Sequence, residues 1–421
     1  MSNQEIPQNF GDGATGSTRS VRGGWSAVFA LTLCVGTLIA SEFMPVSLLS
    51  PIASDLALTE GQAGQAIAVS GIFAVLTSLF LSPATPRIDR RTLLLWLTVL
   101  MIASGLIVAF APSFAVLIIG RALLGVVIGG FWSMSAAIVM RLVREDEVPR
   151  ALGLLNGGNA LATTIAAPLG SFLGQYIGWR GAFFCVVPLA AITLAWQFAT
   201  LPAMSPRGRS SVTAVFRVML LPNVALGILA VSLLFVGQFA LFTYLRPFLE
   251  EVTRVDVSTL SLILLVLGLG GLLGTYLIGM VVQRQLYALL VAMPLVLAAL
   301  GVGLLLLGSS PVGVAVLLAL WGLIATAAPV GWWIWLSKVL PDDAEAGGGL
   351  MVAAIQLAIT LGASAGGLLW DNSGYRATFA AAAGFLCASA LVAFLAARRA
   401  SETRRYEVGA PRSPDTNATS M

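Results

Sequence analysis

Residues 25–49 read WSAVFALTLCVGTLIASEFMPVSLL, and Glu42 is the only charged side chain in this run. A helix that crosses a lipid bilayer needs about 20 mostly apolar residues, so the run predicts a membrane-spanning helix. The preceding residues, 1–24, are polar and rich in Gly, Ser, Asn and Gln, which predicts a disordered tail. Because many similar runs follow, we interpret 25–49 as the first spanning helix and not as a cleavable signal peptide.

The whole chain has the composition of a membrane protein. Of its 421 residues, 58% are hydrophobic and only 10% are charged, whereas an average soluble domain has about 25% charged residues. The sequence therefore predicts an all-α membrane protein, and its twelve apolar runs predict twelve transmembrane helices. The runs are 25–49, 61–84, 92–110, 114–140, 151–176, 182–201, 224–244, 258–282, 287–307, 312–336, 348–370 and 378–397.

The basic residues predict the orientation of these helices. Most of the 23 Lys and Arg residues lie on the side of the N-terminus, and Arg121 lies within a helix. Because short cytoplasmic segments of membrane proteins are rich in Lys and Arg, both termini are expected in the cytoplasm. The basic residues on the opposite side are Arg180, Arg246, Arg254 and Arg376.

The chain also carries an internal repeat. The polar segment 202–223 is interpreted as a cytoplasmic linker between six-helix bundles at 25–201 and 224–397, followed by a cytoplasmic tail at 398–421. Residues 372–379 (NSGYRATF) resemble 176–183 (YIGWRGAF) at an offset of 196 positions. Six helices make an even number of crossings, so the halves have the same topology. This is the parallel repeat of many transporters.

Two charged residues lie well inside the apolar runs, Glu42 and Arg121. An unpaired charge in the bilayer centre costs roughly 2.5–3.5 kcal/mol or more, so such residues face the bundle interior and usually serve function. The chain has no histidine, which leaves Glu42 as the best candidate for a proton carrier. Arg121 cannot lose its proton and would bias Glu42 or bind a substrate. Two other interpretations remain, a fixed ion pair or a position of Glu42 near the outer interface.

A second group of intramembrane residues is polar but uncharged. Amides and indoles in a cavity suit a neutral, planar ligand, because rings stack on aromatic faces while amides bind polar edges. Interhelical hydrogen bonding for the amides and an interfacial belt for the tryptophans are the alternatives. The predicted substrate-binding residues are Trp132, Asn156, Asn159, Gln238, Thr243, Trp332 and Gln356.

The short loop 85–91 contains an acid among basic residues. Anchoring at the cytoplasmic surface explains Arg90 and Arg91 but not Asp89, which we expect to cap or bridge helix ends and so to gate the inner face. Elsewhere, the three cysteines lie alone in apolar runs, without metal-binding spacing. No clustered catalytic residues are found, so we expect neither an enzyme nor a bound metal or cofactor.

Several motifs resemble the major facilitator superfamily, in particular its drug/solute:proton antiporter group. Asp89, Arg90 and Arg91 resemble the motif between the second and third helices, although the usual glycines are replaced. Residues 117–125 (LIIGRALLG) resemble the helix-four motif, and the resemblance implies a proton-coupling role for its Arg121. Residues 167–171 (APLGS), with Pro168 and Gly170, resemble the helix-five antiporter motif, with alanine in place of a glycine.

Longer runs resemble the bacterial purine ribonucleoside efflux pumps. They include 25–29 (WSAVF), 42–49 (EFMPVSLL), 129–136 (GGFWSMSA), 237–240 (GQFA) and 329–332 (PVGW). The resemblance implies the major facilitator fold and export of inosine, guanosine and their analogues in exchange for protons. Sugars or amphipathic drugs are the alternative substrates. It further implies a location in the bacterial inner membrane, with lipid, protons and a small solute as partners. We expect a monomer that does not bind nucleic acid.

Overall fold

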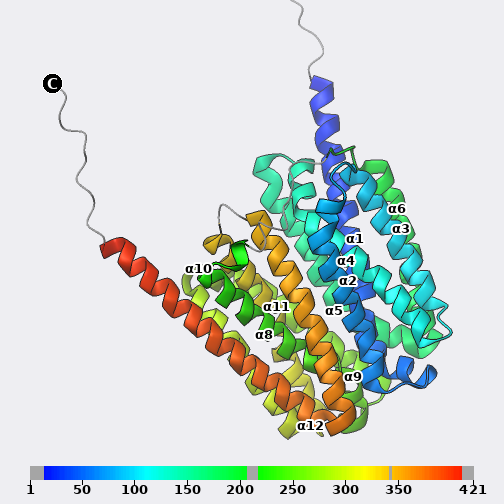
Figure 1. Ribbon diagram of the computed structural model, residues 1–421. Helices are drawn as coiled ribbons and strands as arrows, with labels where there is room; N and C mark the ends of the chain where they lie inside the picture. Colours follow the sequence, from blue (N-terminus) through cyan, green and yellow to red (C-terminus); the bar gives the residue numbers. More distant parts are fainter. Residues whose placement is uncertain (1–13, 206–216, 341–343, 410–421) are drawn as a thin grey trace, which may run out of the picture.

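The computed structural model describes residues 14–205, 217–340 and 344–409. Residues 1–13, 206–216 and 410–421, which belong to the predicted tails and linker, lie outside this description. Helices are the only regular secondary structure among the described residues (Figure 1). The main helices are α1 (Ala14–Asp55), α2 (Glu60–Ala84), α3 (Arg90–Ala109), α4 (Phe114–Leu142), α5 (Val148–Phe184), α6 (Val186–Thr200), α8 (Pro222–Phe242), α9 (Leu245–Phe248), α10 (Val257–Leu307), α11 (Pro311–Val339) and α12 (Ala344–Gly409). The short elements are η1 (Glu145–Glu147) and η2 (Leu249–Thr253).

Ten segments of the described chain are long and apolar enough to cross a membrane. Two of them reverse direction at a glycine, because Gly178 has φ 71° and Gly374 has φ 75°. Only glycine adopts this left-handed conformation without steric cost. The two reversals give twelve helical passes within the described residues, which agrees with the all-α membrane fold predicted from the sequence. The two glycines are also 196 positions apart, so the repeat seen in the sequence shares a backbone turn.

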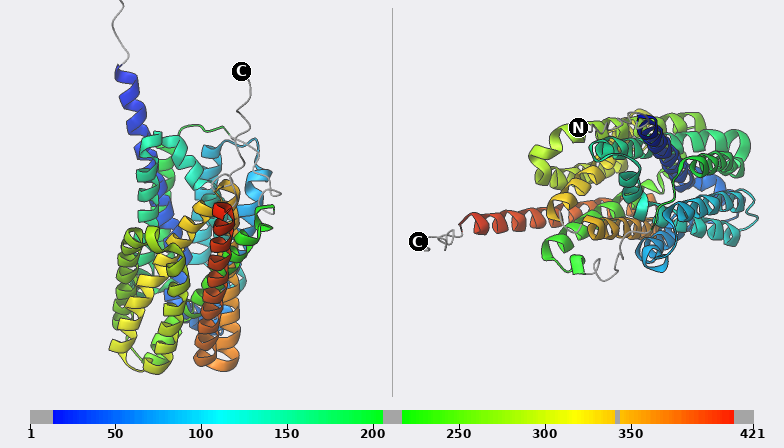
Figure 2. Two further views of the ribbon diagram at one scale, coloured as in Figure 1. Left: turned by 90° about the vertical axis from the view of Figure 1, so that its left-hand side faces the viewer. Right: turned by 90° about the horizontal axis from the view of Figure 1, so that it is seen from above.

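The ends of the chain lie on one side of the molecule. α1 begins at the top of Figure 1, and α12 runs upward to end on the left, level with the upper end of the second half. We call this upper side the tail side, and the opposite side is the far side. The last part of α12 projects away from the other helices (Figures 1 and 2). Residues 14–24, part of the segment predicted to be a disordered tail, belong to α1 here. Helix propagation adds one hydrogen bond per residue to an existing helix, which makes such extensions inexpensive.

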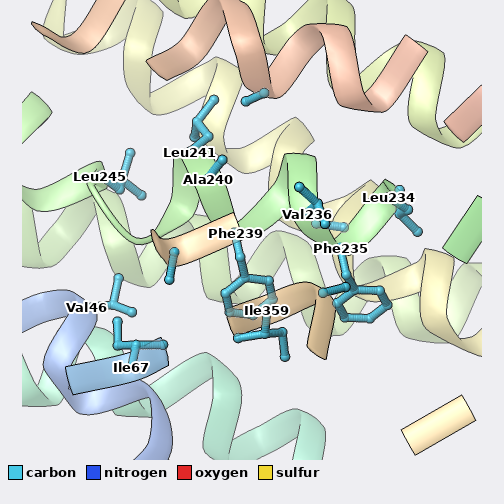
Figure 3. Close-up of a cluster of buried hydrophobic side chains, with 14 of the residues drawn as sticks. Val46, Ile67, Leu234, Phe235, Val236, Phe239, Ala240, Leu241, Leu245 and Ile359 are labelled. Atoms are coloured by element: carbon cyan, nitrogen blue, oxygen red, sulfur yellow. The ribbon is translucent and has the colours of Figure 1, made fainter. Parts of the chain in front are cut away.

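The hydrophobic core joins the two halves on the far side. One cluster of buried side chains combines Val46 and Ile67 of the first half with Phe239 and Ile359 of the second (Figure 3). The other cluster, nearer the tail side, draws all its buried residues from the first half, between Ala27 and Met204. Burial against the partner half therefore stabilises the far side more than the tail side.

The space around individual glycines also differs between the far side and the tail side. A Cβ atom on Gly64 of α2 would lie 2.1 Å from the hydroxyl of Tyr244, and one on Gly268 of α10 would lie 2.6 Å from the carbonyl of Thr164. Closer to the tail side, a Cβ on Gly157 or Gly349 would meet no atom within 4 Å. Small residues let helix backbones approach closely. The close contacts between the halves thus lie on the far side, where hydrogen bonds also join α2 to α12.

Candidate functional site

Two aromatic rings mark the axis between the halves. Phe43 of α1 and Phe239 of α8 are 196 positions apart, and their stacked ring centroids are 6.0 Å apart. Equivalent positions of two parallel repeats can touch only close to the axis that relates them. Glu42 and Gln238, the preceding residues, are likewise equivalent and so flank this axis.

Arg121 lies behind this axis and is 1% exposed. Its Nη1 donates to the carbonyl of Ser41 over 2.7 Å, and its Nε donates to the carbonyl of Ala66 over 3.0 Å. Its Nη2 donates to the hydroxyl of Ser70 over 3.0 Å and to the backbone carbonyl of Glu42 over 3.3 Å. The guanidinium therefore joins α4 to α1 and α2 through fixed hydrogen bonds.

Pro45 explains why α1 offers Arg121 an acceptor. In a helix the carbonyl of Ser41 accepts from the backbone N–H four residues later, but that residue is Pro45, which has no N–H. A buried carbonyl without a partner costs about 1–3 kcal/mol. Arg121 supplies the missing donor, so the proline and the arginine form one structural unit.

Glu42 is 7% exposed and faces the other half of the molecule. Gln356 Nε2 of α12 donates to Glu42 Oε1 over 3.4 Å. Among the ion pairs of the described residues, none joins the carboxylates of Glu42 to Arg121. The two charges nevertheless act on each other, so the interpretation of a fixed ion pair stays a prediction. The guanidinium of Arg121 makes its hydrogen bonds to the backbone carbonyls of α1 and α2 and to Ser70.

Three of the predicted substrate-binding residues carry polar atoms that are buried without a hydrogen-bond partner among the described residues. They are Gln238 Oε1, Thr243 Oγ1 and Gln356 Oε1. Buried polar groups in proteins are nearly always paired, so each of these atoms needs an explanation, and a solute or water is the simplest. All three lie in the second half of the chain, on α8, just after it and on α12.

The other predicted binding residues are placed differently. Asn156 is exposed, and its Nδ2 donates to the carbonyl of Leu152 within its own helix over 3.0 Å. Asn159 is half-buried in the same helix. Trp332 is buried and packs edge-on against Trp335, and Trp132 packs edge-on against Phe131. No contact brings Trp132 and Trp332 together within the described residues, so the two indoles do not form the sides of one aromatic clamp in this conformation.

The antiporter-motif residues lie at two helix contacts. Pro168 of α5 removes the backbone donor for the carbonyl of Thr164, at the point where Gly268 of α10 comes closest. Thr164 Oγ1 donates to the carbonyl of Gly268 over 3.1 Å, which links the two halves. Gly170 lies against Ser47 and Met44 of α1, since a Cβ there would fall 2.6 Å from Ser47 Oγ.

The loop with Asp89 ties helix ends together within the first half. The Asp89 carboxylate caps α3 by accepting from the backbone of Arg91 and also accepts from Met204 N over 2.6 Å. Arg91 donates to the carbonyl of Phe198 at the end of α6 over 2.7 Å, and the side chain of Arg90 donates to Thr85. The predicted capping and bridging are confirmed. These bonds do not cross to the second half, and gating by the loop stays a prediction.

Sequence reasoning missed Asp371 of α12, which crosses to the first half on the far side. Its carboxylate accepts from Thr59 Oγ1 over 2.6 Å and from Gly61 N over 3.0 Å, at the start of α2. A carboxylate at a helix N-terminus satisfies free N–H groups and favours the helix dipole. The sequence contains one signal of this contact, an acidic residue at the far-side end of an apolar run. No local pattern predicts that it contacts Thr59 and Gly61.

A groove of about 540 Å³ between α3 and α6 contains none of the predicted binding residues. Its walls include the exposed side chains of Trp96 and Phe198. Because both helices span the membrane, this groove faces the surroundings of the bundle and not the axis between the halves.

Comparisons of the sequence and of the structure with known proteins agree on one family of transporters. The model of the Major Facilitator Superfamily matches residues 28–349. Two solved structures share the fold. A bacterial homologue of the human lysosomal transporter Spinster, inward-facing and unoccupied, has a TM-score of 0.68 at 16% identity, covering 93% of this chain and 99% of that one. A D-xylose-proton symporter has a TM-score of 0.71 at 18% identity, covering 88% and 97%.

Curated relatives are similar over nearly the full length. The Transcription regulatory protein OpdE of Pseudomonas aeruginosa is 57% identical over 380 residues, which cover 89% of this chain and 94% of that protein. The Purine ribonucleoside efflux pump NepI of Salmonella paratyphi B is 41% identical over 391 residues, which cover 93% and 97%.

Proposed function

We propose that this chain, which belongs to the Major Facilitator Superfamily, exports purine ribonucleosides from the cytoplasm in exchange for protons. The substrate class is supported by the relative named as a purine ribonucleoside efflux pump, at 41% identity over most of both chains. A multi-pass membrane fold made of two repeated halves supports transport as the general activity.

The observation that carries the proton-coupled mechanism is the position of Glu42. Its buried carboxylate lies beside the axis and takes a hydrogen bond from Gln356 in the opposite half. A group that gains or loses a proton at this contact changes how strongly the halves hold together. A buried carboxylate is also costly in its charged form, which makes proton binding an effective switch.

The direction of the proposed cycle rests on the basic residues, whose distribution favours a cytoplasmic tail side. In the conformation described above the close contacts between the halves lie on the opposite, far side, and in the proposed cycle a nucleoside enters from the cytoplasm when Glu42 is deprotonated. We place the protein in the bacterial inner membrane. Rocking of the halves would then release the nucleoside on the far side of that membrane. A proton taken up there neutralises Glu42 and favours the return.

The proposed binding groups are the unpartnered atoms of Gln238, Thr243 and Gln356. A purine nucleoside carries N–H and O–H donors that match the two amide oxygens and the hydroxyl. The phenylalanines on the axis add aromatic faces for the base. Sugars and amphipathic drugs remain the alternative solutes for the same mechanism.

The relative named as a transcription regulatory protein favours a second candidate, an effect on gene expression. An exporter that lowers the cytoplasmic concentration of an inducer changes transcription without contacting DNA. The two names are therefore compatible with one transport activity.

The deciding experiment measures uptake of labelled inosine into everted membrane vesicles, with and without an imposed proton gradient. A sugar and an amphipathic drug are assayed in parallel. Gradient-driven accumulation of inosine above both comparison solutes supports the proposal. Accumulation that survives collapse of the gradient would contradict proton coupling, and preference for another solute would contradict the substrate class.

A further inference from the structure

Arg246 joins the two halves on the far side and is not part of the site described above. It belongs to α9 in the second half and is 5% exposed. Its Nη1 donates to the backbone carbonyl of Ser47 in α1, with Ser171 Oγ of α5 at 3.5 Å. One arginine of the second half thus contacts two helices of the first.

Pro51 explains why Ser47 offers a free carbonyl. The carbonyl of Ser47 would accept from the backbone N–H four residues later, but Pro51 has none. The pattern repeats that of Pro45 and Arg121, with one difference. Arg121 belongs to the same half as α1 and stays with it when the halves rock, whereas Arg246 must release Ser47 whenever the far side opens.

Carboxylates from both halves surround this arginine. Arg246 Nε pairs with Glu250 Oε1 in η2 over 2.8 Å. Glu60, the first residue of α2 in the opposite half, interacts electrostatically with Arg246 and with Glu250 and Glu251. One oxygen of Glu60, Oε2, is buried without a hydrogen-bond partner among the described residues. From α1 and α5, Arg246 contacts the carbonyl of Ser47 and the hydroxyl of Ser171, which carry no charge. The carboxylate of Asp371 in α12 instead accepts hydrogen bonds at the start of α2.

The balance of charge makes far-side contact sensitive to protons. Closure brings Glu60 of the first half towards Glu250 and Glu251 of the second, with a single guanidinium to offset three carboxylates. Partial burial, and then the charge of Glu250 in the same segment, raise the pKa of Glu251, and closure adds the like charge of Glu60 from the other half. A carboxyl group whose pKa is higher in the closed state takes up a proton on closing, so acidification favours closure.

We propose that Arg246 and Glu60 form a far-side latch that holds the halves together more strongly when a carboxyl group of this cluster is protonated from the far side. The proposal deepens the antiport mechanism and rests on it for the direction of the cycle. External protons then act at two places. They neutralise Glu42, and they favour closure of the far side behind the departed solute. In this scheme Arg246 and Glu60 are positioning residues that do not contact the solute.

The test measures conformation without any solute. The full chain, with Cys34, Cys185 and Cys387 replaced by serine, carries spin labels at Gln175→Cys and Ser373→Cys, which are exposed at the far-side ends of the two halves. Pulsed electron paramagnetic resonance in lipid nanodiscs gives the distance distribution between pH 5 and pH 8. We expect the closed, short-distance population to grow on acidification, and we expect Glu60→Gln to remain closed across the range. At pH 8 this variant should raise the closed-to-open ratio about tenfold, equivalent to one unit of pKa coupling.

Two further variants weaken the hydrogen bond between Arg246 and the Ser47 carbonyl, one from the donor side and one from the acceptor side. Arg246→Gln removes the donor, and Pro51→Ala restores an intrahelical donor to the Ser47 carbonyl without touching the arginine. Both should lower the closed population, and Pro51→Ala remains informative if Arg246→Gln fails to fold. Asp55→Asn is the matched control, because Asp55 is a far-side carboxylate that pairs with Arg180 of its own half. It should keep the wild-type pH response.

The latch and the antiport mechanism fail in different ways. If Glu60→Gln keeps the wild-type pH response while Glu42→Gln abolishes it, the latch is overturned and proton coupling at Glu42 stands. If the response persists in Glu42→Gln and disappears in Glu60→Gln, the latch is supported whatever the solute is. A closed population unchanged in both Arg246→Gln and Pro51→Ala also overturns it.

Discussion

The guanidinium of Arg121 donates to the carbonyl of Ser41, which Pro45 leaves without its normal helix partner. The contact joins α4 to α1 directly beneath Glu42. It also shows how a proline inside a membrane helix is tolerated, since a side chain from a neighbouring helix satisfies the carbonyl group that the proline frees.

Arg121→Lys should impair folding and transport together. Lysine has one ammonium group and cannot span the carbonyls of Ser41 and Ala66 as the planar guanidinium does. Each acceptor left unpaired costs about 1–3 kcal/mol. The thermal stability of the purified variant is the measurement. Adding Pro45→Ala should recover part of the loss, and wild-type stability in Arg121→Lys would contradict this role.

Glu42→Gln should abolish uphill transport while leaving exchange intact. The variant mimics the protonated carboxyl group and keeps a hydrogen-bonding partner for Gln356. Counterflow of labelled inosine needs no proton movement, so it serves as the internal control. Gradient-driven accumulation at the wild-type level in Glu42→Gln would show that another group couples the proton.

Removal of the unpartnered amide in α8 should weaken binding without weakening the fold. In Gln238→Met the unpaired Oε1 is lost, which costs no existing hydrogen bond. If a solute uses this oxygen, the Kd for inosine should rise about tenfold or more, the loss of roughly one hydrogen bond. Ser389→Ala is the matched control, because it breaks a bond to Ala230 in the same half. It should lower stability and leave the Kd unchanged.

Asp371→Ala should shift the conformational equilibrium towards far-side opening. The variant removes the carboxylate that caps α2 from the other half, while the capping box of Thr59 and Gln62 keeps α2 helical. The loss of a cap costs about 1 kcal/mol, which corresponds to roughly a fivefold change in the ratio of states. Labelling of a single cysteine at Ser364, which lies between the halves, reports the opening. Unchanged labelling from the far side would exclude this role.

The stack of Phe43 on Phe239 should be worth about 0.5–1.5 kcal/mol beyond its buried area. A double-mutant cycle with Phe43→Leu and Phe239→Leu, read by thermal unfolding, isolates the pair term. Additive effects would mean that the rings pack independently and do not join the halves.

Much of the fold was predictable because lipid imposes a simple rule on sequence. A bilayer rewards apolar runs of fixed length, and these runs are visible one at a time. The reversal at Gly374 was visible too, as an echo of the sequence around Gly178. The candidate site was only partly predictable. Glu42 and Arg121 stood out as charges in apolar surroundings, but nothing local indicates that backbone carbonyls and Ser70 take the hydrogen bonds of Arg121.

The sequence by itself determined the membrane environment, the number of helices, the duplication and the two intramembrane charges, since each depends on residue type and spacing along the chain. Only the tertiary structure decided the partners. Gln356 meets Glu42, Asp371 meets the start of α2, and Arg246 meets the carbonyl of Ser47. These contacts join residues that are hundreds of positions apart, and they depend on how the two halves are tilted in one conformation. That tilt is set by the packing of small residues across the interface, which no single stretch of sequence records.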